Sequence, residues 1–160
     1  IGTQDISQFE QGSHTGEVTA SMIYDSFKYT IVGHSERRNQ LMESEGMIVK
    51  KLEQLQLNHM TSILCVRNEQ DTLYKHPSLI AFEPVEDIGT GHSMSVDEVL
   101  EMKKKLQLNP NQLFLYGGSV NQDTCVQYIK KPEINGFLVG TAALEPAKFI
   151  GILQQYLLTE

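Results

Sequence analysis

The sequence has few cysteines, no long apolar run and no excess of basic residues. Its two cysteines, Cys65 and Cys125, are far apart, which excludes a disulfide framework and a paired Cys-x-x-Cys metal site. We expect both thiols to be reduced and buried, as in a cytoplasmic protein. The apolar runs are far shorter than the roughly 20 residues of a membrane-spanning helix. The start of the chain also lacks the charged and then apolar pattern of a secretory signal.

The charge of the chain argues against another class of partner. The formal net charge is −7, whereas a protein that binds nucleic acid needs a basic face. An anionic substrate would have to be held by local groups, such as backbone N–H groups, against the overall field. With 160 residues, of which 40% are hydrophobic and 21% charged, the chain is large enough for one domain with a hydrophobic core.

Short apolar segments alternate with segments of helical periodicity. Six of the apolar segments are typical of strands buried on both faces, and most are bounded by glycine, proline, asparagine or serine. The expected strands are Ile1–Asp5, Tyr29–Gly33, Thr61–Val66, Leu79–Glu83, Gln112–Tyr116 and Gly136–Val139. The chain opens on such a strand without a methionine, so we expect further sequence upstream of it.

Helices are expected between these strands. Their expected ranges are Thr19–Ser26, Ser44–Leu57, Val96–Leu106, Asn121–Lys130 and Ala147–Leu158. Ser95 and Glu98 have the spacing of a capping box, Asn121 can cap the helix that follows it, and Pro146 stands where a first-turn proline is tolerated. Strand alternating with helix predicts an α/β fold of parallel βαβ units in one domain, residues 1–160. Periodicity alone leaves open whether the sheet is doubly wound or part of a barrel.

Polar and small residues follow the ends of these strands, where α/β proteins place their sites. His34 is followed at once by a serine, a glutamate and two arginines. Glu83 closes an apolar strand, where a carboxylate is costly unless it has a role or a partner. Small residues follow the last two strands, at 117–119 and 140–141. They allow backbone N–H groups to approach a phosphate closely, in the placement described for (β/α)₈ barrels.

Together these motifs resemble the signatures of the triosephosphate isomerase family, in that family's order. They are Gly-His-Ser-Glu-Arg-Arg at 33–38, Glu-Pro-Val-x-x-Ile-Gly-Thr-Gly at 83–91, Tyr-Gly-Gly-Ser-Val at 116–120 and Gly-Phe-Leu-Val-Gly at 136–140. Gln4 with Asp5, which stands in place of the usual Asn, resembles the third strand, and Thr15-Gly16-Glu17 resembles the third loop. The resemblance runs from residue 1 to about residue 158. It implies a (β/α)₈ TIM barrel, of which the chain holds the third to the eighth strand–helix unit.

The resemblance also implies a reaction and a set of roles. The reaction interconverts dihydroxyacetone phosphate and glyceraldehyde 3-phosphate through an enediolate, in glycolysis and gluconeogenesis, with no metal or cofactor, in a cytoplasmic homodimer. His34 corresponds to the electrophile and Glu83 to the catalytic base, and Ser35 and Glu36 support the site. Pro84–Gly91 corresponds to the lid. The family positions that bind the substrate phosphate correspond to Gly89, Ser119, Gly140 and Thr141. Those at the dimer interface correspond to Thr15, Glu17 and Arg37. We also expect the N-terminus of the Ser44–Leu57 helix to disfavour a charged imidazole.

Several departures from the family pattern leave two alternatives open. Glu86 and Asp87 stand where the lid usually has Trp and Ala, and two carboxylates there would oppose anion binding. Thr141 replaces the usual second glycine, and a β-branched residue adopts positive φ only at a cost. These changes would suit a related aldose–ketose isomerase acting on another sugar phosphate, or a catalytically degenerate barrel that serves as a binding protein. The presence of both His34 and Glu83 argues against the degenerate barrel, and a substrate panel would separate the two isomerases.

Two further departures concern the length of the chain. The segment Arg67–Ser78 is shorter than in most family members. The absent first two units would include the family's Asn-x-Lys strand end, whose lysine contacts substrate. Because six strands cannot close a barrel of this type, we expect the 160 residues alone to be inactive until those units are supplied.

Overall fold

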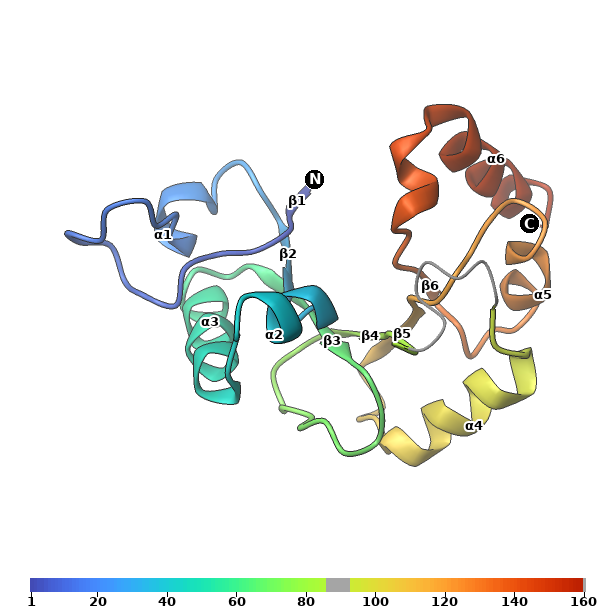
Figure 1. Ribbon diagram of the computed structural model, residues 1–160, viewed down its shortest axis with the longest axis horizontal. Helices are drawn as coiled ribbons and strands as arrows, with labels where there is room; N and C mark the ends of the chain where they lie inside the picture. Colours follow the sequence, from blue (N-terminus) through green and yellow to red (C-terminus); the bar gives the residue numbers. More distant parts are fainter. Residues whose placement is uncertain (86–92, 160) are drawn as a thin grey trace. The chain divides into compact units, whose positions relative to one another are not determined.

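The computed structural model describes residues 1–85 and 93–159, which fall into two units (Figure 1). Unit 1 comprises Ile1–Val66 and Thr72–Ile80. Unit 2 comprises Arg67–Asp71 and the described residues after Ile80. No helix in the described ranges is long and apolar enough to cross a membrane.

Unit 1 is built on three parallel strands. These are β1 (Gly2–Thr3), β2 (Tyr29–Val32) and β3 (Thr61–Val66), with β2 paired to both of the others. The register places Tyr29 beside Thr61 and Val32 beside Leu64. The helices of the unit are α1 (Ala20–Ile23), α2 (Ser35–Gln40) and α3 (Glu45–Leu57).

The long helix of unit 1, α3, forms as the sequence predicts. Ser44 precedes it in an extended conformation, and its hydroxyl accepts a hydrogen bond from the N–H of Met47 at 3.3 Å, which satisfies one of the donors that a helix N-terminus leaves open. The helix contacts β2 and β3 and buries Ile48, Leu52 and Leu55. Burial of this apolar stripe is what holds a helix of this length against a sheet.

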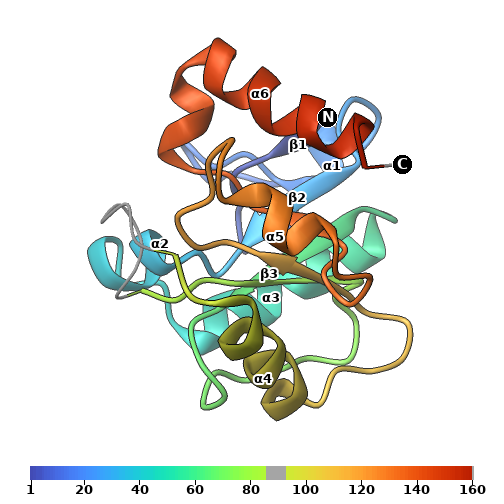
Figure 2. The same ribbon diagram turned by 90° about the vertical axis from the view of Figure 1, so that its right-hand side faces the viewer.

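Strand β4 (Leu79–Phe82) crosses from unit 1 into unit 2, which also contains the parallel pair β5 (Leu113–Tyr116) and β6 (Gly136–Phe137). The N–H of Gly117 donates to the carbonyl of Phe82 at 2.8 Å, so the ends of β4 and β5 meet. The helices of unit 2 are α4 (Val96–Leu106), α5 (Cys125–Ile129), the 3₁₀ helix η1 (Thr141–Leu144) and α6 (Pro146–Leu157). Helices α5 and α6 contact each other (Figure 2).

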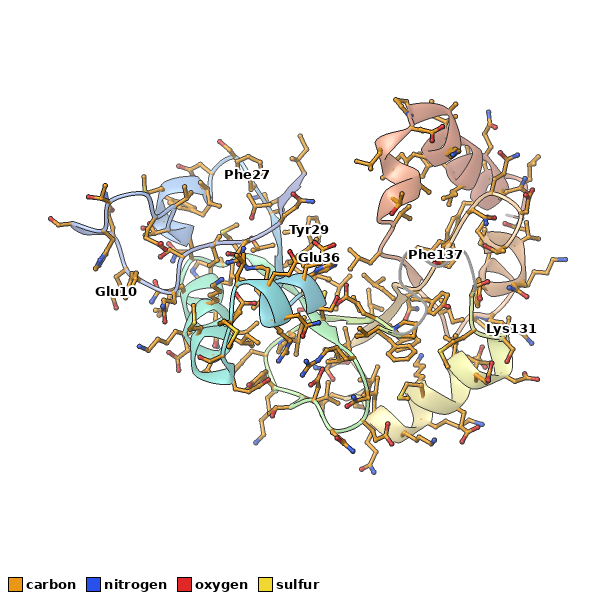
Figure 3. All side chains as sticks on the ribbon, in the orientation of Figure 1. Glu10, Phe27, Tyr29, Glu36, Lys131 and Phe137 are labelled. Carbon is orange, nitrogen blue, oxygen red and sulfur yellow. The ribbon has the colours of Figure 1, made fainter. Side chains whose placement is uncertain are left out.

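Buried aromatic rings form the core of unit 2. The ring of Tyr116 lies 4.7 Å from that of Tyr128 and 6.5 Å from that of Phe82, which in turn stacks on Phe114 at 6.4 Å. Phe137, labelled in Figure 3, extends the cluster with its ring 6.1 Å from Tyr128. Separations of this size are typical of favourable aromatic pairs. The residues that follow β4 and β5 are therefore attached to strands anchored by this aromatic packing.

The sequence-based expectations hold for most elements. The capping box of Ser95 and Glu98 is present, and Pro146 opens α6. Strand β3 has the expected bounds, whereas β1 and β6 are shorter than expected. Helix α5 begins later than expected, because Asn121 accepts hydrogen bonds from the N–H groups of residues 123 and 124 and so caps a turn that precedes the helix. Two elements, α2 and η1, were not expected.

Candidate active site

His34 stands at the point where β2 ends and α2 begins. Gly33, immediately before it, has φ +71°, a left-handed conformation that favours glycine. His34 is the N-cap of α2, and its Nδ1 accepts a hydrogen bond from the N–H of Glu36 at 3.3 Å. A nitrogen that accepts carries no proton, so this geometry selects a neutral imidazole whose proton is on Nε2. The side chain of His34 is 26% exposed.

This geometry corrects one expectation from the sequence. The first helix after His34 is α2 and not α3, so the N-terminus of α3 is not the feature that disfavours a charged imidazole. The N–H of Glu36, inside α2, has that effect through a direct hydrogen bond. Ser35 is buried in the first turn of α2, while the carboxylate of Glu36 is exposed (Figure 3) and lies 3.9 Å from Nδ1 of His34. In this arrangement the backbone of Glu36 makes the closer contact with the imidazole.

The two arginines that follow Glu36 have different partners: Arg38 pairs with Glu45, and Arg37 pairs with Asp5 and Glu43. Arg37 joins a buried charged cluster in which it lies 2.7 Å from Asp5 and 3.2 Å from Glu43. Lys51, from α3, binds the same two carboxylates and lies 2.6 Å from Asp5. Arg37, expected at a dimer interface, is thus held by contacts within its own unit. This cluster could not be predicted from local patterns, because its members come from four separate segments.

The pKa values of the two carboxyls in this cluster, Asp5 and Glu43, shift in opposite directions. Burial raises the pKa of Asp5 above its usual value, although Lys51 and Arg37 oppose the shift. Burial acts the same way on Glu43, but the hydrogen bond and charge of Lys51, with those of Arg37, lower the pKa of Glu43 below its usual value. One Glu43 oxygen, Oε2, is buried without a hydrogen-bond partner. From the pKa directions, ionisation in the folded state costs Asp5 more than it costs Glu43.

Glu83 directly follows β4 in unit 2 and is 1% exposed. A Cβ atom placed on Gly117 would lie 3.3 Å from Cγ of Glu83, 3.1 Å from the carbonyl oxygen of Phe82 and 3.5 Å from Cβ of Leu138. The end of β4, the residue after β5 and the residue after β6 therefore meet around this carboxylate. Gly118 has a different packing role, since a Cβ there would be 2.2 Å from the Tyr116 hydroxyl. These glycines were expected to let backbone N–H groups approach a phosphate, and packing alone already requires them.

The positions expected to bind phosphate lie after the last two strands of unit 2. Ser119 is half-buried shortly after β5, and Gly140 is exposed as the N-cap of η1. Thr141 is the first residue of η1 and is not among the residues with positive φ. The backbone cost expected for a threonine at this position is therefore absent. Gly89, Glu86 and Asp87 lie outside the described residues, as does most of the expected lid.

The expected dimer positions Thr15 and Glu17 lie in the exposed loop between β1 and α1. The N–H of Glu17 donates to the carbonyl of His14 at 3.0 Å, and the ring of His14 stacks on Phe9 at 4.3 Å. These contacts shape the loop within one chain. The approach of His34 to Glu83 stays a prediction, since the two residues belong to different units.

Parallel strands alternating with helices, with a histidine shortly after β2 and a buried glutamate directly after β4, are features of the α/β barrel enzymes. A family model described as triosephosphate isomerase matches residues 1–76 and 69–156. The chain is 33% identical to the triosephosphate isomerase of Mesomycoplasma hyorhinis, 34% to that of Polynucleobacter asymbioticus and 33% to that of Coxiella burnetii. Each match covers 96% of the chain and 72% to 74% of the relative.

The chain belongs to the triosephosphate isomerase family. Its six described strands are accordingly part of a (β/α) barrel of the TIM type. The family is one of isomerases, and the chain is an intramolecular oxidoreductase of that class. The chain spans about three-quarters of the length of the relatives that it matches.

Proposed function

We propose that this chain interconverts dihydroxyacetone phosphate and glyceraldehyde 3-phosphate with Glu83 as the base and His34 as the electrophile. The observation that supports these roles best is the hydrogen bond from the Glu36 N–H to Nδ1 of His34. It leaves Nε2–H as the donor of a neutral ring, and a neutral imidazole is the established electrophile of this family. The chemistry of the reaction then assigns a task to each side chain.

The isomerisation moves one proton between two adjacent carbons. Glu83 removes a proton from the carbon beside the carbonyl group, and the electron pair of that C–H bond forms the enediolate. The negative charge develops on oxygen, where Nε2–H of His34 donates a hydrogen bond. Glu83 then returns the proton to the neighbouring carbon, while the hydroxyl proton of the first carbon passes to the former carbonyl oxygen, a transfer that the His34 imidazole can relay. The exchange needs no oxidant or metal. Burial of Glu83 beside Gly117 supports this role, because a base must be held in a fixed position.

The substrate phosphate would bind through main-chain N–H groups at Ser119, Gly140 and Thr141, with Gly89 as the contribution of the lid. Local donors of this kind are what a chain with a net charge of −7 requires for an anion. Closure of Pro84–Gly91 would exclude water and so suppress loss of phosphate from the enediolate. The negative φ of Thr141 is compatible with this use of its N–H group.

We also propose a homodimer in the cytoplasm. Thr15 and Glu17 lie in an exposed loop that the stacking of His14 on Phe9 and a backbone hydrogen bond hold in shape, as an interface loop would need. Arg37, which is only partly exposed, would support that interface from within the chain. Both cysteines are buried and form no disulfide, which suits a reducing compartment.

The test is a turnover assay with both triose phosphates and a panel of longer sugar phosphates. It uses the 160-residue chain alone and the chain fused behind the first two strand–helix units of the Mesomycoplasma hyorhinis relative. We expect turnover of triose phosphate in the fused form and little in the chain alone, and the active form is called the reference enzyme below. Turnover only of a longer sugar phosphate would instead identify a related isomerase. No turnover in either form would contradict the proposed function.

A further inference from the structure

Arg38 connects the end of β2 to the end of β3. Its side chain is 5% exposed. Its Nε donates to the carbonyl oxygen of Gly33 at 2.7 Å, and its Nη2 donates to the carbonyl oxygen of Cys65 at 3.4 Å. The carbonyl of Gly33 belongs to the peptide bond that leads into His34. The guanidinium therefore fixes the orientation of the peptide bond between Gly33 and His34, and with it the backbone that carries the imidazole.

The guanidinium is itself held from the other side. Its Nη1 pairs with Oε1 of Glu45, the first residue of α3, and Oε2 of the same carboxylate accepts a hydrogen bond from the hydroxyl of Tyr74. Glu45 thus uses one oxygen for each partner. Burial, together with the hydrogen bond to Glu45, raises the pKa of Tyr74 to about 12. The phenol therefore stays protonated and remains a donor throughout the neutral range.

The contact between Arg38 and Gly33 leaves little room for adjustment. A Cβ atom on Gly33 would lie 2.9 Å from Nη2 of Arg38 and 3.2 Å from Cδ1 of Ile48. The guanidinium packs directly against the backbone of Gly33, with α3 behind it. A rotation of the guanidinium would consequently displace the carbonyl that it binds, and with it the start of α2.

Tyr74 comes from the connection between β3 and β4. This connection, residues 67–78, contains no helix in the structure, which describes all of these residues. The phenol gives this short segment a defined contact with the N-terminus of α3.

We propose that Tyr74, Glu45 and Arg38 are positioning residues for His34, acting in series through three side-chain contacts on the carbonyl of Gly33. The inference rests on the proposed role of His34 as the electrophile. A hydrogen-bond donor stabilises developing charge only when it is placed accurately, and small displacements are costly. Loss of the outermost contact therefore lowers kcat while leaving KM nearly unchanged, because it disturbs the donor and not the phosphate-binding groups.

The first test compares Tyr74→Phe, which removes only the hydroxyl, with Tyr24→Phe, an exposed tyrosine of the same unit. In the reference enzyme we expect Tyr74→Phe to lower kcat by about five-fold with KM changed less than two-fold. Tyr24→Phe should change neither constant. A melting temperature is measured for both, and a lower melting temperature for Tyr74→Phe with wild-type kcat would reduce Tyr74 to a merely structural role and overturn the proposal.

A double-mutant cycle tests whether the contacts act in series. If Tyr74 acts only through Glu45, then Tyr74→Phe has no further effect on kcat in the Glu45→Ala background, which has no side-chain oxygen to accept from the phenol. Independent losses that multiply in the double variant would contradict the series. Arg38→Lys, which keeps the charge but loses the fork that reaches Gly33, Cys65 and Glu45, should have the largest effect of the three single substitutions.

A spectroscopic measurement separates failure of this proposal from failure of the proposed function. The ring nitrogens of His34 are observed by ¹⁵N NMR in the same variants. We expect Tyr74→Phe to shift the His34 signals and Tyr24→Phe to leave them unchanged. Unshifted His34 signals would overturn the positioning role whatever the kinetics. Wild-type turnover in His34→Asn, with shifted signals in Tyr74→Phe, would instead reject His34 as electrophile and keep its positioning.

Discussion

Gly117 determines the space available to Glu83. A Cβ atom at position 117 would come within 3.3 Å of Cγ of the glutamate and 3.1 Å of the carbonyl oxygen of Phe82, which are closer than most contacts of that kind. The glycine therefore has a role that is independent of any phosphate. It allows a buried carboxylate to lie against the turn that follows β5, with Leu138 on the other side.

Gly117→Ala should consequently affect catalysis more than folding. The added methyl group must push Glu83 or the backbone of Phe82 by a few tenths of an ångström, and we expect kcat to fall about ten-fold or more. Overpacking of this size typically costs about 1–3 kcal/mol of stability. The measurements are steady-state kinetics and thermal unfolding of the reference enzyme.

Gly46→Ala is the matched control for this substitution. Gly46 lies in α3, where the nearest atom to an added Cβ is the Ser44 hydroxyl oxygen at 3.9 Å. Gly46 is in the first turn of α3, so alanine there should raise stability by no more than about 0.5 kcal/mol and leave kcat unchanged. Equal kcat in the two variants would show that room beside Glu83 is not limiting.

Glu83→Asp keeps the charge of the base but withdraws it by one methylene. Because proton transfer requires sub-ångström placement, we expect kcat to fall by about 10² or more while KM changes much less. Single-turnover and steady-state assays with both triose phosphates would measure the effect. Near-wild-type turnover would remove Glu83 from the mechanism.

Asp5→Asn should stabilise the protein at neutral pH. Burial raises the pKa of Asp5, so the folded state binds its proton more tightly than the unfolded state does. The stability linked to Asp5 is therefore fully present below its usual value of 3.8 and is lost as the pH rises through the higher folded value. Asparagine cannot ionise and avoids this loss, while Glu43 still balances the charge of Lys51.

The measurement is the melting temperature of both proteins from pH 3.5 to pH 7.5, roughly the span over which a carboxyl of this kind titrates. The advantage of Asp5→Asn should be present at neutral pH and disappear toward the acidic end. Glu43, whose lowered pKa produces the opposite dependence, shares Lys51 and Arg37 with Asp5, so a Glu43→Gln background is measured alongside to isolate the contribution of Asp5. Asp25→Asn, at an exposed turn, is the control and should show no such trend. A less stable Asp5→Asn at neutral pH would contradict the argument.

Deletion of residues 12–16 should produce monomers with little activity. The segment contains Thr15 and lies in the exposed loop between β1 and α1. The stack of His14 on Phe9 would be lost with it. Sedimentation velocity of the reference enzyme and of the deletion variant measures the change, and an unchanged dimer would show that this loop is not the interface.

The elements that could be predicted from the sequence are those with local signals. Strand β3 is a continuous apolar run, and α4 and α6 begin at a capping box and at a proline. Helix α2 could not be found by periodicity, because its sequence is polar throughout. It forms because His34 caps it and because the buried face of Arg38 is satisfied by hydrogen bonds and an ion pair instead of apolar contacts.

In the candidate site, too, features with a local sequence signal could be predicted and features without one could not. His34 and Glu83 could be predicted because each follows an apolar strand directly, at the edge where α/β folds place their sites. The charged cluster of Asp5, Glu43 and Lys51, and the contact of Tyr74 with Glu45, could not be predicted, since each joins residues that are remote in the sequence. Only the crossing of separate strands and helices brings such partners together.

The aromatic core of unit 2 has a consequence for optical measurements. The chain has no tryptophan, so its near-ultraviolet circular dichroism comes mainly from tyrosine and phenylalanine. Tyr116 and Tyr128 are fully buried and held 4.7 Å apart at an angle of 38°, whereas Tyr24 and Tyr29 of unit 1 are largely exposed. Tyr74 of unit 1 is held through its hydroxyl by Glu45 and also contributes to the band. The close coupling between the rings of Tyr116 and Tyr128 nevertheless belongs to the unit that carries Glu83, so the part of the signal lost in a Tyr128→Phe variant would report the melting of that core.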